Sequence, residues 1–318
     1  MRLARPSAVT VRRLALASMV ANSAIVVTGG AVRLTSSGLG CPAWPRCTDG
    51  SYTPTAEYAE HGTIEFGNRM LTFVLGLVAL ATLVAVLRQR PRRGPLVGLA
   101  TAAFLGIPAQ AVLGGITVLT GLNPWTVAGH FLLSEVLVAV TVALWWRART
   151  PHDGPARPVV RADLLLLGRV LVGVTAVVLA LGTVVTGSGP HAGDEAAART
   201  GFDPATVAQL HADAVMLLIG LTAATVIALR ATGAPAGVRR AAAVLLGVEL
   251  GQGLLGFVQY VTGLPVVLVG LHLVGACLVW IAALRLLLSM RVRPDEPGPA
   301  GAGARVEATA LEPAGPAG

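Results

Sequence analysis

The sequence predicts an all-α polytopic membrane protein with eight transmembrane helices, arranged as two tandem four-helix bundles related by internal duplication. Three observations predict this fold. Of the 318 residues, 54% are hydrophobic and only 13% are charged, about half the charged fraction of a soluble domain. The apolar residues gather in eight segments of about 20 residues, the length that spans a hydrocarbon core. A motif in the first half also recurs in the second half.

The apolar segments set the expected boundaries of the helices. We expect transmembrane helices at residues 14–34, 64–87, 96–118, 127–146, 163–185, 205–229, 241–261 and 267–288. The corresponding domains are an N-terminal bundle at 1–146, a cytoplasmic linker at 147–162, a C-terminal bundle at 163–290 and a tail at 291–318. The tail is rich in Pro, Gly and Ala, a composition that predicts disorder. The first segment lacks a small-residue cleavage site, so we interpret it as a retained helix and not a secretory signal.

Arginine accounts for the basic net charge of +8, since the sequence contains no lysine. With eight spans both termini lie on one side, and that side carries Arg2, Arg5, Arg12, Arg13, Arg88, Arg90, Arg92, Arg93, Arg147, Arg149, Arg157, Arg161, Arg230, Arg239, Arg240, Arg291 and Arg293. The opposite loops carry Arg33, Arg46, Arg69 and Arg199. The positive-inside rule therefore predicts cytoplasmic termini. Because the arginines are spread over separate loops, we expect no nucleic-acid partner.

The internal repeat has the pattern Q-x-x-L-G-x5-T-G-L-x7-H. It occurs at Gln110, Leu113, Gly114, Thr120, Gly121, Leu122 and His130, and again at Gln252, Leu255, Gly256, Thr262, Gly263, Leu264 and His272. The offset of 142 residues equals four spans, and an even number of crossings keeps the orientation of each repeat. A functional site in one bundle should therefore have a counterpart in the other.

Three histidines, His130, His211 and His272, fall a turn or so inside the outer ends of the fourth, sixth and eighth spans. Ionisable groups inside a membrane are costly and mark functional sites. His211 and His272 belong to one bundle at similar depth, an arrangement suited to six-coordinate haem iron. Small residues nearby leave room for a macrocycle: Ala212, Ala214, Gly270 and Gly275. The alternative is that each histidine is buried and hydrogen-bonded to a neighbouring helix.

The N-terminal bundle contains only half of this pair. His130 corresponds to His272, but an offset of 143 residues from His211 leads to Asn68. Glu65 shares a helix face with Asn68 at i, i+3, and His61 lies on about the same face two turns earlier. We therefore expect an open or differently completed site in this bundle, with Glu65 as an acidic group near the outer membrane surface. The structural alternative for Glu65 is an i, i+4 ion pair with Arg69.

Two of the three cysteines, Cys41 and Cys47, lie in the first outer loop between Gly and Pro residues. That side of a bacterial membrane is oxidising, so we expect a disulfide. The spacing leaves open whether the disulfide is a structural staple or a redox-active pair. Cys277, in the eighth span, reads as a small buried side chain.

Taken in order, these motifs resemble the haem A synthase family over nearly the whole chain to about residue 290. The resemblance rests on the stretch Val27–Gly38 running into the cysteine loop, the Glu65 motif, Gly129-His130, the stretch Gly182–Asp194, Leu210-His211 and Leu271-His272. The family's usual E-x-x-H motif reads Glu65-Phe66-Gly67-Asn68 here. This departure leaves His130 as the one obvious ligand of a substrate iron, with Asn68, His61, water or nothing as the second.

The resemblance implies oxidation of the C8 methyl group of haem O to the formyl group of haem A, through successive hydroxylations, for cytochrome oxidase assembly. It implies haem b between His211 and His272, the substrate haem at His130, an important glutamate at Glu65 and a cysteine pair at Cys41 and Cys47. Haem O synthase, an unidentified electron acceptor, membrane lipid and a second copy of the chain are the expected partners. The alternative functions are a two-haem electron carrier, or quinol oxidoreductase, and a transporter built from parallel repeats.

Overall fold

Eight long helices make up most of the described chain. The computed structural model describes residues 5–150 and 153–293, and within them the long helices are α1 (Ala8–Leu34), α2 (Ala59–Arg88), α3 (Gly94–Leu119), α4 (Pro124–Ala148), α5 (Ala162–Ser188), α6 (Pro204–Ala231), α7 (Ala236–Val261) and α8 (Val266–Ser289). All eight are long and apolar enough to cross a membrane. The predicted all-α membrane fold is therefore confirmed.

The helix boundaries agree with the expected spans, with the largest difference at the start of α1. This helix begins at Ala8 and not at residue 14, because Ser7 caps it: the Ser7 side chain accepts a hydrogen bond from the backbone N–H of Thr10 at 3.1 Å. A cap of this kind extends a helix beyond its apolar portion. The added turn contains Arg12 and Arg13, which a prediction from hydropathy alone leaves outside the helix.

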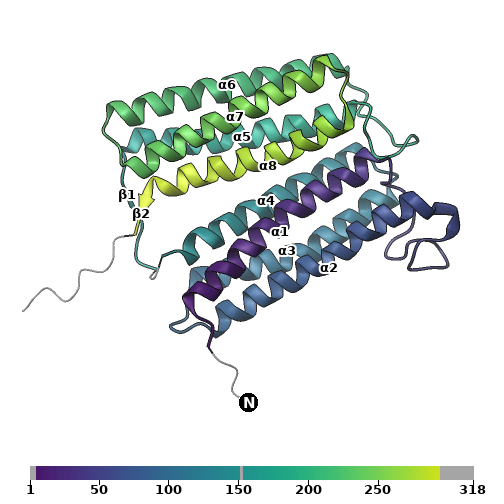
Figure 1. The fold of residues 1–318 in the computed structure, drawn as a ribbon, viewed down its shortest axis with the longest axis horizontal. Coiled ribbons are helices and arrows are strands. Elements are labelled where there is room, and N and C mark those ends of the chain that lie inside the picture. Colours follow the sequence, from purple (N-terminus) through teal and green to yellow (C-terminus); the bar gives the residue numbers. More distant parts are fainter. Residues whose placement is uncertain (1–4, 151–152, 294–318) are drawn as a thin grey trace, which may run out of the picture.

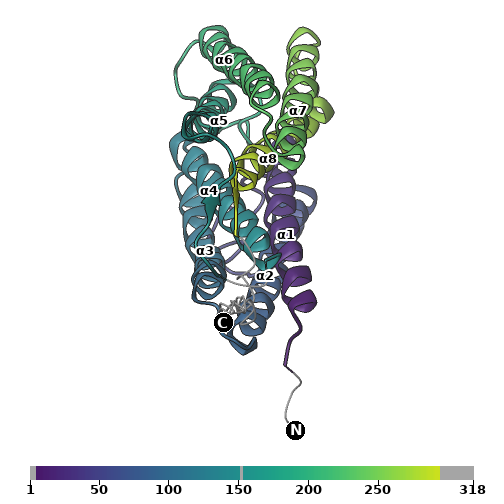
Figure 2. The same cartoon turned by 90° about the vertical axis from the view of Figure 1, so that its left-hand side faces the viewer.

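The eight helices form two four-helix bundles, which lie one above the other as two layers. In Figure 1, α5 to α8 lie above α1 to α4, with all helices running nearly parallel to one long direction. Turned by 90°, Figure 2 shows α8 lying between the upper layer and helices α1 and α4 of the lower layer. The layers contact one another through α4 with α8, α1 with α8, and α4 with α5. This arrangement is compatible with tandem duplication.

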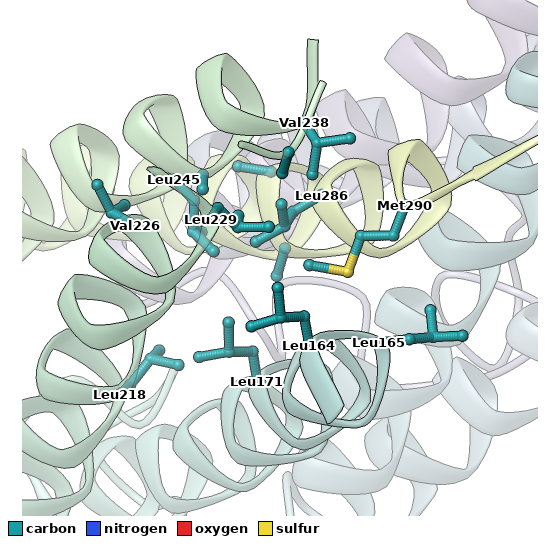
Figure 3. Packing of buried hydrophobic residues seen from close by; sticks show 14 of the residues in the cluster. Leu164, Leu165, Leu171, Leu218, Val226, Leu229, Val238, Leu245, Leu286 and Met290 are labelled. Carbon is teal, nitrogen blue, oxygen red and sulfur yellow. The ribbon is translucent and has the colours of Figure 1, made fainter. Parts of the chain in front are cut away.

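The buried apolar clusters of both bundles lie toward the arginine-rich end. In the C-terminal bundle, the cluster in Figure 3 includes Leu171, Leu229, Leu245, Leu286 and Met290. Its counterpart in the N-terminal bundle contains Val11, Ala15, Ala85, Val86, Leu96, Ala100, Leu144 and Ala148. The buried residues of α6 begin at Leu218, those of α7 end at Glu249 and those of α8 begin at Cys277. Apolar packing thus fills the arginine-rich half of the C-terminal bundle, and the buried residues of α6, α7 and α8 do not extend to the opposite end, which is called the outer end below.

The contact between the two bundles contains a polar pair at repeat-equivalent positions. Glu135 of α4 and Cys277 of α8 are both buried, and the Cys277 thiol donates to Glu135 Oε1 at 3.7 Å. The Trp280 indole N–H donates to the backbone oxygen of Glu135 at 2.9 Å. Trp280 packs with Val138, so the polar pair lies beside an apolar cluster. The prediction of a buried Cys277 is confirmed.

The linker and the start of the predicted tail pair with one another. β1 (Arg157–Pro158) and β2 (Arg291–Val292) form a short antiparallel pair at the end of the bundles marked in Figure 1. The expectation of disorder from residue 291 is therefore wrong for its first two residues, because the linker supplies backbone partners to them. Residues 294–318, the rest of that expectation, lie outside the described residues.

Charged groups tie the linker to the N-terminal bundle. Arg93 donates to Asp153 Oδ1 through Nη2 at 2.7 Å and Nε at 3.1 Å, and to the Thr150 carbonyl at 2.7 Å. Partial burial raises the pKa of Asp153, but hydrogen bonds and charge from Arg93 and Arg147 outweigh it and hold that pKa below its ordinary value of 3.8. The linker is thus anchored by an ionised carboxylate at neutral pH.

Candidate functional site

The structure brings His211 of α6 and His272 of α8 together near the outer end of the C-terminal bundle. Both rings are half-buried, and their helices belong to the same four-helix bundle. The Nδ1 atoms of both rings are buried and lack a hydrogen-bond partner within the described residues. The two histidines of the expected pair thus belong to one bundle, and their Nδ1 atoms make no described hydrogen bond to a neighbouring helix.

Glycines on neighbouring helices receive the two imidazole rings. A Cβ atom built on Gly182 of α5 would lie 3.3 Å from Cε1 of His211, and one built on Gly256 of α7 would lie 3.1 Å from Cε1 of His272. A larger residue at either position would push the ring away. Gln252, one turn before Gly256, donates from Nε2 to the carbonyl oxygen of His272 at 2.7 Å. Helices α5 and α7 thus fix the positions of histidines that α6 and α8 carry.

His130 of α4 has the same surroundings in the N-terminal bundle. A Cβ atom built on Gly114 would lie 3.1 Å from Cε1 of His130. Gln110 donates from Nε2 to the carbonyl oxygen of His130 at 3.1 Å. The Nδ1 atom of His130 is also buried without a described hydrogen-bond partner. The repeated motif therefore encodes a repeated structural unit around one histidine in each bundle.

The loops that follow these units are repeated as well. Leu122 and Leu264 both adopt left-handed backbone angles, with φ of +58° and +60°. Each donates its N–H to a carbonyl five residues earlier, Thr117 or Gln259, at 2.8 Å. Left-handed leucine is unusual, so its occurrence at both positions is a strong likeness between the halves.

Asn68 and His61, the two candidate side chains for a second ligand in the N-terminal bundle, contact different parts of the structure. The Asn68 side-chain oxygen accepts a hydrogen bond from Thr28 Oγ1 at 2.8 Å, between α2 and α1. His61 is exposed, and its Nδ1 lies 3.0 Å from Ser37 Oγ in the first outer loop. The structure therefore places Asn68 against α1 and His61 against the loop. Within the described residues, neither makes a hydrogen bond to His130.

Glu65 is held at the foot of the cysteine loop. Its side chain is 6% exposed. Oε2 accepts the backbone N–H of Cys41 at 2.7 Å, and Oε1 accepts from Arg69 Nη2 at 2.5 Å and Nε at 3.1 Å. The i, i+4 ion pair considered from the sequence is thus formed. The contact with Cys41, which sequence spacing does not reveal, connects Glu65 to the loop.

Arg69 completes this attachment by donating to three loop carbonyls. Its Nη2 reaches the Cys41 oxygen at 2.8 Å, and its Nη1 reaches the oxygens of Ala43 and Arg46 at 3.1 and 2.9 Å. These bonds satisfy backbone groups that would otherwise lack partners near the membrane. One guanidinium therefore fixes most of the turn between the two cysteines.

The loop is closed by the predicted disulfide, which is present between Cys41 and Cys47. Both sulfur-bearing residues are fully buried. Trp44, between them, reaches α3, where a Cβ atom on Gly115 would overlap its indole ring. Gly115 follows Gly114, the glycine beneath His130, so the cysteine loop packs directly beside the His130 unit.

The outer loops of the two bundles are also joined. The Gly38 N–H donates to the Gly193 oxygen at 2.9 Å, and Arg33 Nη2 donates to the Thr186 oxygen at 2.7 Å. His191 Nε2 lies 2.9 Å from the Leu264 oxygen. These contacts give a structural role to the sequence stretches Val27–Gly38 and Gly182–Asp194.

Two buried carboxyl groups were not identified from the sequence. Glu249 of α7 is 3% exposed, with Oε1 accepting from Thr222 at 3.0 Å, and Glu135 of α4 is also 3% exposed. In each, Oε2 lacks a described partner. A signal was available, because an acidic residue inside an apolar span is a functional candidate by default.

The residues at the outer end of the C-terminal bundle fit a haem group. Two imidazoles from one bundle lie toward that end, and their buried Nδ1 atoms have no described partner, a donor set that suits haem iron. Within the described chain, the residues of α6 before Leu218, of α7 after Glu249 and of α8 before Cys277 are partly buried or exposed. In the N-terminal bundle, His130 offers a single imidazole in an equivalent setting.

The family model for COX15-CtaA, described as cytochrome oxidase assembly protein, matches residues 12–284 and so covers every residue of both units. The chain belongs to this family. A COX15-CtaA assignment also agrees with the order of the motifs noted in the sequence.

Relatives of this COX15-CtaA chain include two named heme A synthase. The protein from Symbiobacterium thermophilum is 35% identical over 156 residues, which are 46% of this chain and 50% of that relative. The one from Azorhizobium caulinodans is 28% identical over 334 aligned positions, covering 88% of this chain and 93% of that relative. A protoheme IX farnesyltransferase from Haloquadratum walsbyi is 26% identical over 132 residues, 27% of its length. The chain thus spans about half of the Symbiobacterium relative and nearly all of the Azorhizobium one.

Proposed function

We propose that this chain is a haem A synthase, which oxidises the C8 methyl group of haem O to a formyl group and so supplies haem A to cytochrome oxidase. The observation that carries the proposal is the unequal pair of histidine units. One bundle carries two histidines, His211 and His272, whereas the other carries His130 and has Asn68 at the position that corresponds to His211 by sequence offset. A permanent cofactor suits the first, and a haem that must enter, react and leave suits the second.

The C-terminal bundle would hold haem b through His211 and His272. When bound, haem b supplies one-electron transfer. The chain supplies the ligand geometry: Gly182 and Gly256 admit the rings, and Gln252 fixes the backbone at His272. We assign residues 163–290 to this bundle, 147–162 to the linker and 291–318 to the tail.

The N-terminal bundle, residues 1–146, would bind the substrate haem O through His130. Gln110 and Gly114 set the position of that imidazole. Asn68, which accepts a hydrogen bond from Thr28, corresponds to His211 by a sequence offset of 143 residues. We propose that Asn68 leaves the second face of the substrate iron without a strong protein ligand, so that the substrate is bound less tightly than haem b. His61, exposed beside Ser37, is the less favoured candidate for that face.

Glu65 is the proposed catalytic residue. Oxidation of the methyl group proceeds through an alcohol to a geminal diol, which loses water to give the formyl group, and each oxidation removes electrons and protons. Glu65 lies at the outer end of α2 with its carboxyl buried, where it can accept protons or stabilise positive charge developing at the methyl carbon. Arg69 and the Cys41 N–H hold the carboxyl in one orientation.

The proposed partners follow from the reaction. Haem O synthase is the enzyme that would deliver the substrate. An electron acceptor, membrane lipid and a second copy of the chain complete the set. The arginine-rich end of the helices supports cytoplasmic termini.

Expression in a host that makes haem O but not haem A tests the proposal. Chromatography of extracted haems should show haem A, or the alcohol intermediate, only when the chain is present. A host expressing the His130→Ala variant provides the matched control. Bound haem b with haem O unchanged, in a host where a known synthase is active, would instead favour the two-haem electron carrier.

A further inference from the structure

A second site lies at the opposite, arginine-rich end of the molecule, where the two bundles meet. A hollow of about 400 Å³ is lined there by Arg12, Arg13, Leu16, Trp145, Arg149 and Arg285. These residues come from α1 and α4 of one bundle and α8 of the other. The hollow therefore lies at the interface between the two bundles, at the opposite end of the helices from the histidine units.

Tryptophan rings orient two of its four arginines. The Arg149 guanidinium carbon lies 4.9 Å from the centre of the Trp145 ring and 5.0 Å from that of Trp146. The Arg285 guanidinium carbon lies 5.9 Å from the Trp145 ring centre. Stacking on an aromatic ring holds a guanidinium by its flat face and leaves its N–H edge available. Arg149 and Arg285 therefore converge on the same ring with donors to spare.

The positive charge in the hollow lacks a counter-ion. None of the six lining residues is acidic. Across residues 5–150 and 153–293, the hydrogen bonds and ion pairs include none made by the Arg12, Arg13, Arg149 or Arg285 side chain. Four cations brought together in this way repel one another unless an anion joins them. Arg93, by contrast, is satisfied by Asp153 on the same side of the protein.

The depth of the hollow matches that of a lipid headgroup. Arg12 lies four residues into α1, Trp145 three residues before the end of α4 and Arg285 four residues before the end of α8. At 1.5 Å per residue, these positions lie about 5–6 Å inside the helix ends. Tryptophan and arginine are enriched at this level of a membrane.

An apolar track leads from the hollow toward the middle of the membrane. Leu16 and Val20, one turn apart on α1, are 40% and 56% exposed. Leu278, two turns from Arg285 on α8, is 51% exposed. Helices α1 and α8 contact each other, so these side chains border the seam between the bundles. An acyl chain would make apolar contacts along these side chains, whereas a free inorganic anion would not.

We propose that this hollow binds the phosphate group of an anionic phospholipid, with its acyl chains along the seam between α1 and α8. The phosphate accepts hydrogen bonds from Arg149 and Arg285, and Arg12 and Arg13 add attractive charge. Because the arginines that contact the phosphate come from both bundles, the bound lipid stabilises the interface between them. This proposal is independent of the proposed reaction.

Lipid retention on the purified full chain tests it. The wild-type chain and the Arg149→Gln/Arg285→Gln variant are each exchanged into mixed micelles that contain phosphatidylglycerol or phosphatidylcholine, and the lipid retained by each protein is measured. The matched control is Arg239→Gln/Arg240→Gln, which removes the same charge from exposed positions on α7 outside the hollow. At about fivefold per arginine, loss of two should weaken phosphatidylglycerol retention about thirtyfold, and the control should leave it nearly unchanged.

Thermal unfolding supplies the second measurement. Phosphatidylglycerol should raise the unfolding temperature of the wild-type chain and of the Arg149→Lys/Arg285→Lys variant, which keeps the charge and serves if the glutamine variant does not fold. Equal retention by the glutamine variant and its control would overturn the proposal. So would equal stabilisation by phosphatidylcholine, or stabilisation by inorganic phosphate alone as large as that by phosphatidylglycerol.

Discussion

The two bundles hold a histidine in the same way and differ in what they place opposite it. Gln110 and Gln252 donate to the carbonyls of His130 and His272 over the same separation of 20 residues. The glycines beneath the two rings also come equally close. Opposite His272 stands His211, whereas the corresponding part of the N-terminal bundle has Asn68, bonded to Thr28.

Under the proposed function, this difference distinguishes the site of a permanent haem from the site of a substrate haem. Two imidazoles give iron two strong ligands, which suits a haem that stays. One imidazole gives weaker attachment and lets the haem exchange. The added disulfide loop, with Glu65 at its foot, occurs only beside the one-histidine unit within the described chain. The proposed catalytic residue and the disulfide loop that holds it therefore lie beside the unit that has one histidine.

Removing either histidine of the complete pair should have the largest effect. Loss of an outer-shell partner alone costs about 10–100-fold in metal affinity, so His211→Ala or His272→Ala should abolish stable haem b binding. Pyridine haemochrome spectra of the purified protein measure the bound haem b. The exposed His61→Ala variant is the control and should retain it. Full haem b in both alanine variants would remove the distinction between the bundles.

Neutralising Glu65 should act on the reaction and not on haem b. Glu65→Gln should lower haem A formation about a hundredfold or more, the usual contribution of a positioned acid–base group, while the haem b content stays unchanged. Glu60→Gln, at an exposed position on the same helix, is the matched control. Undiminished conversion of haem O by the Glu65→Gln protein would show that Glu65 serves only to hold the loop.

Adding the missing histidine should make the two bundles more alike. The Asn68→His variant adds a second imidazole to the proposed substrate site, so bound haem O should become six-coordinate and low-spin. Its dissociation should slow by up to about tenfold. Absorption spectra of the haem O complex measure the change. Asn68→Ala, which loses the Thr28 bond without adding a ligand, should not produce it. An unchanged spectrum in Asn68→His would place position 68 away from the iron.

Opening the disulfide should have the smallest effect on activity. Both cysteines are fully buried, which denies access to an attacking thiol, so we expect a staple. The Cys41→Ala/Cys47→Ala protein should lose about 2 kcal/mol of stability from the short closed loop and keep its activity within about twofold. Thermal unfolding and haem A yield measure the two effects. A folded variant without activity would instead indicate a redox role.

The spans and the ligand candidates could be predicted because their signals are local or periodic. Twenty apolar residues specify a transmembrane helix wherever they occur, and the repeated motif gave His130 and His272 together. The two-residue strands β1 and β2 carry no such pattern, so the pairing of Arg157–Pro158 with Arg291–Val292 was missed. The start of α1 depended on one capping hydrogen bond from Ser7.

The surroundings of Glu65 could not be predicted because they join distant residues. Spacing suggested the Arg69 partner four residues away, but not the Cys41 N–H, 24 residues earlier in the chain. The carbonyls that Arg69 reaches lie 23 to 28 residues away from it. Backbone groups of an irregular loop have no sequence signature. Only the folded loop shows that one ion pair both fixes the carboxyl and supports the disulfide.

The contact between Glu135 and Cys277 occupies positions 142 residues apart, the same offset as the repeat. Contact of a residue with its own counterpart is the mark of an isologous interface, as in a two-fold homodimer. In a dimer of identical chains, both partners at that position would be the same residue, and two buried carboxyls would repel each other. One continuous chain is free of this constraint. The two equivalent positions can therefore carry different residues, and here an acid faces a thiol where a symmetric dimer would have to place two identical side chains.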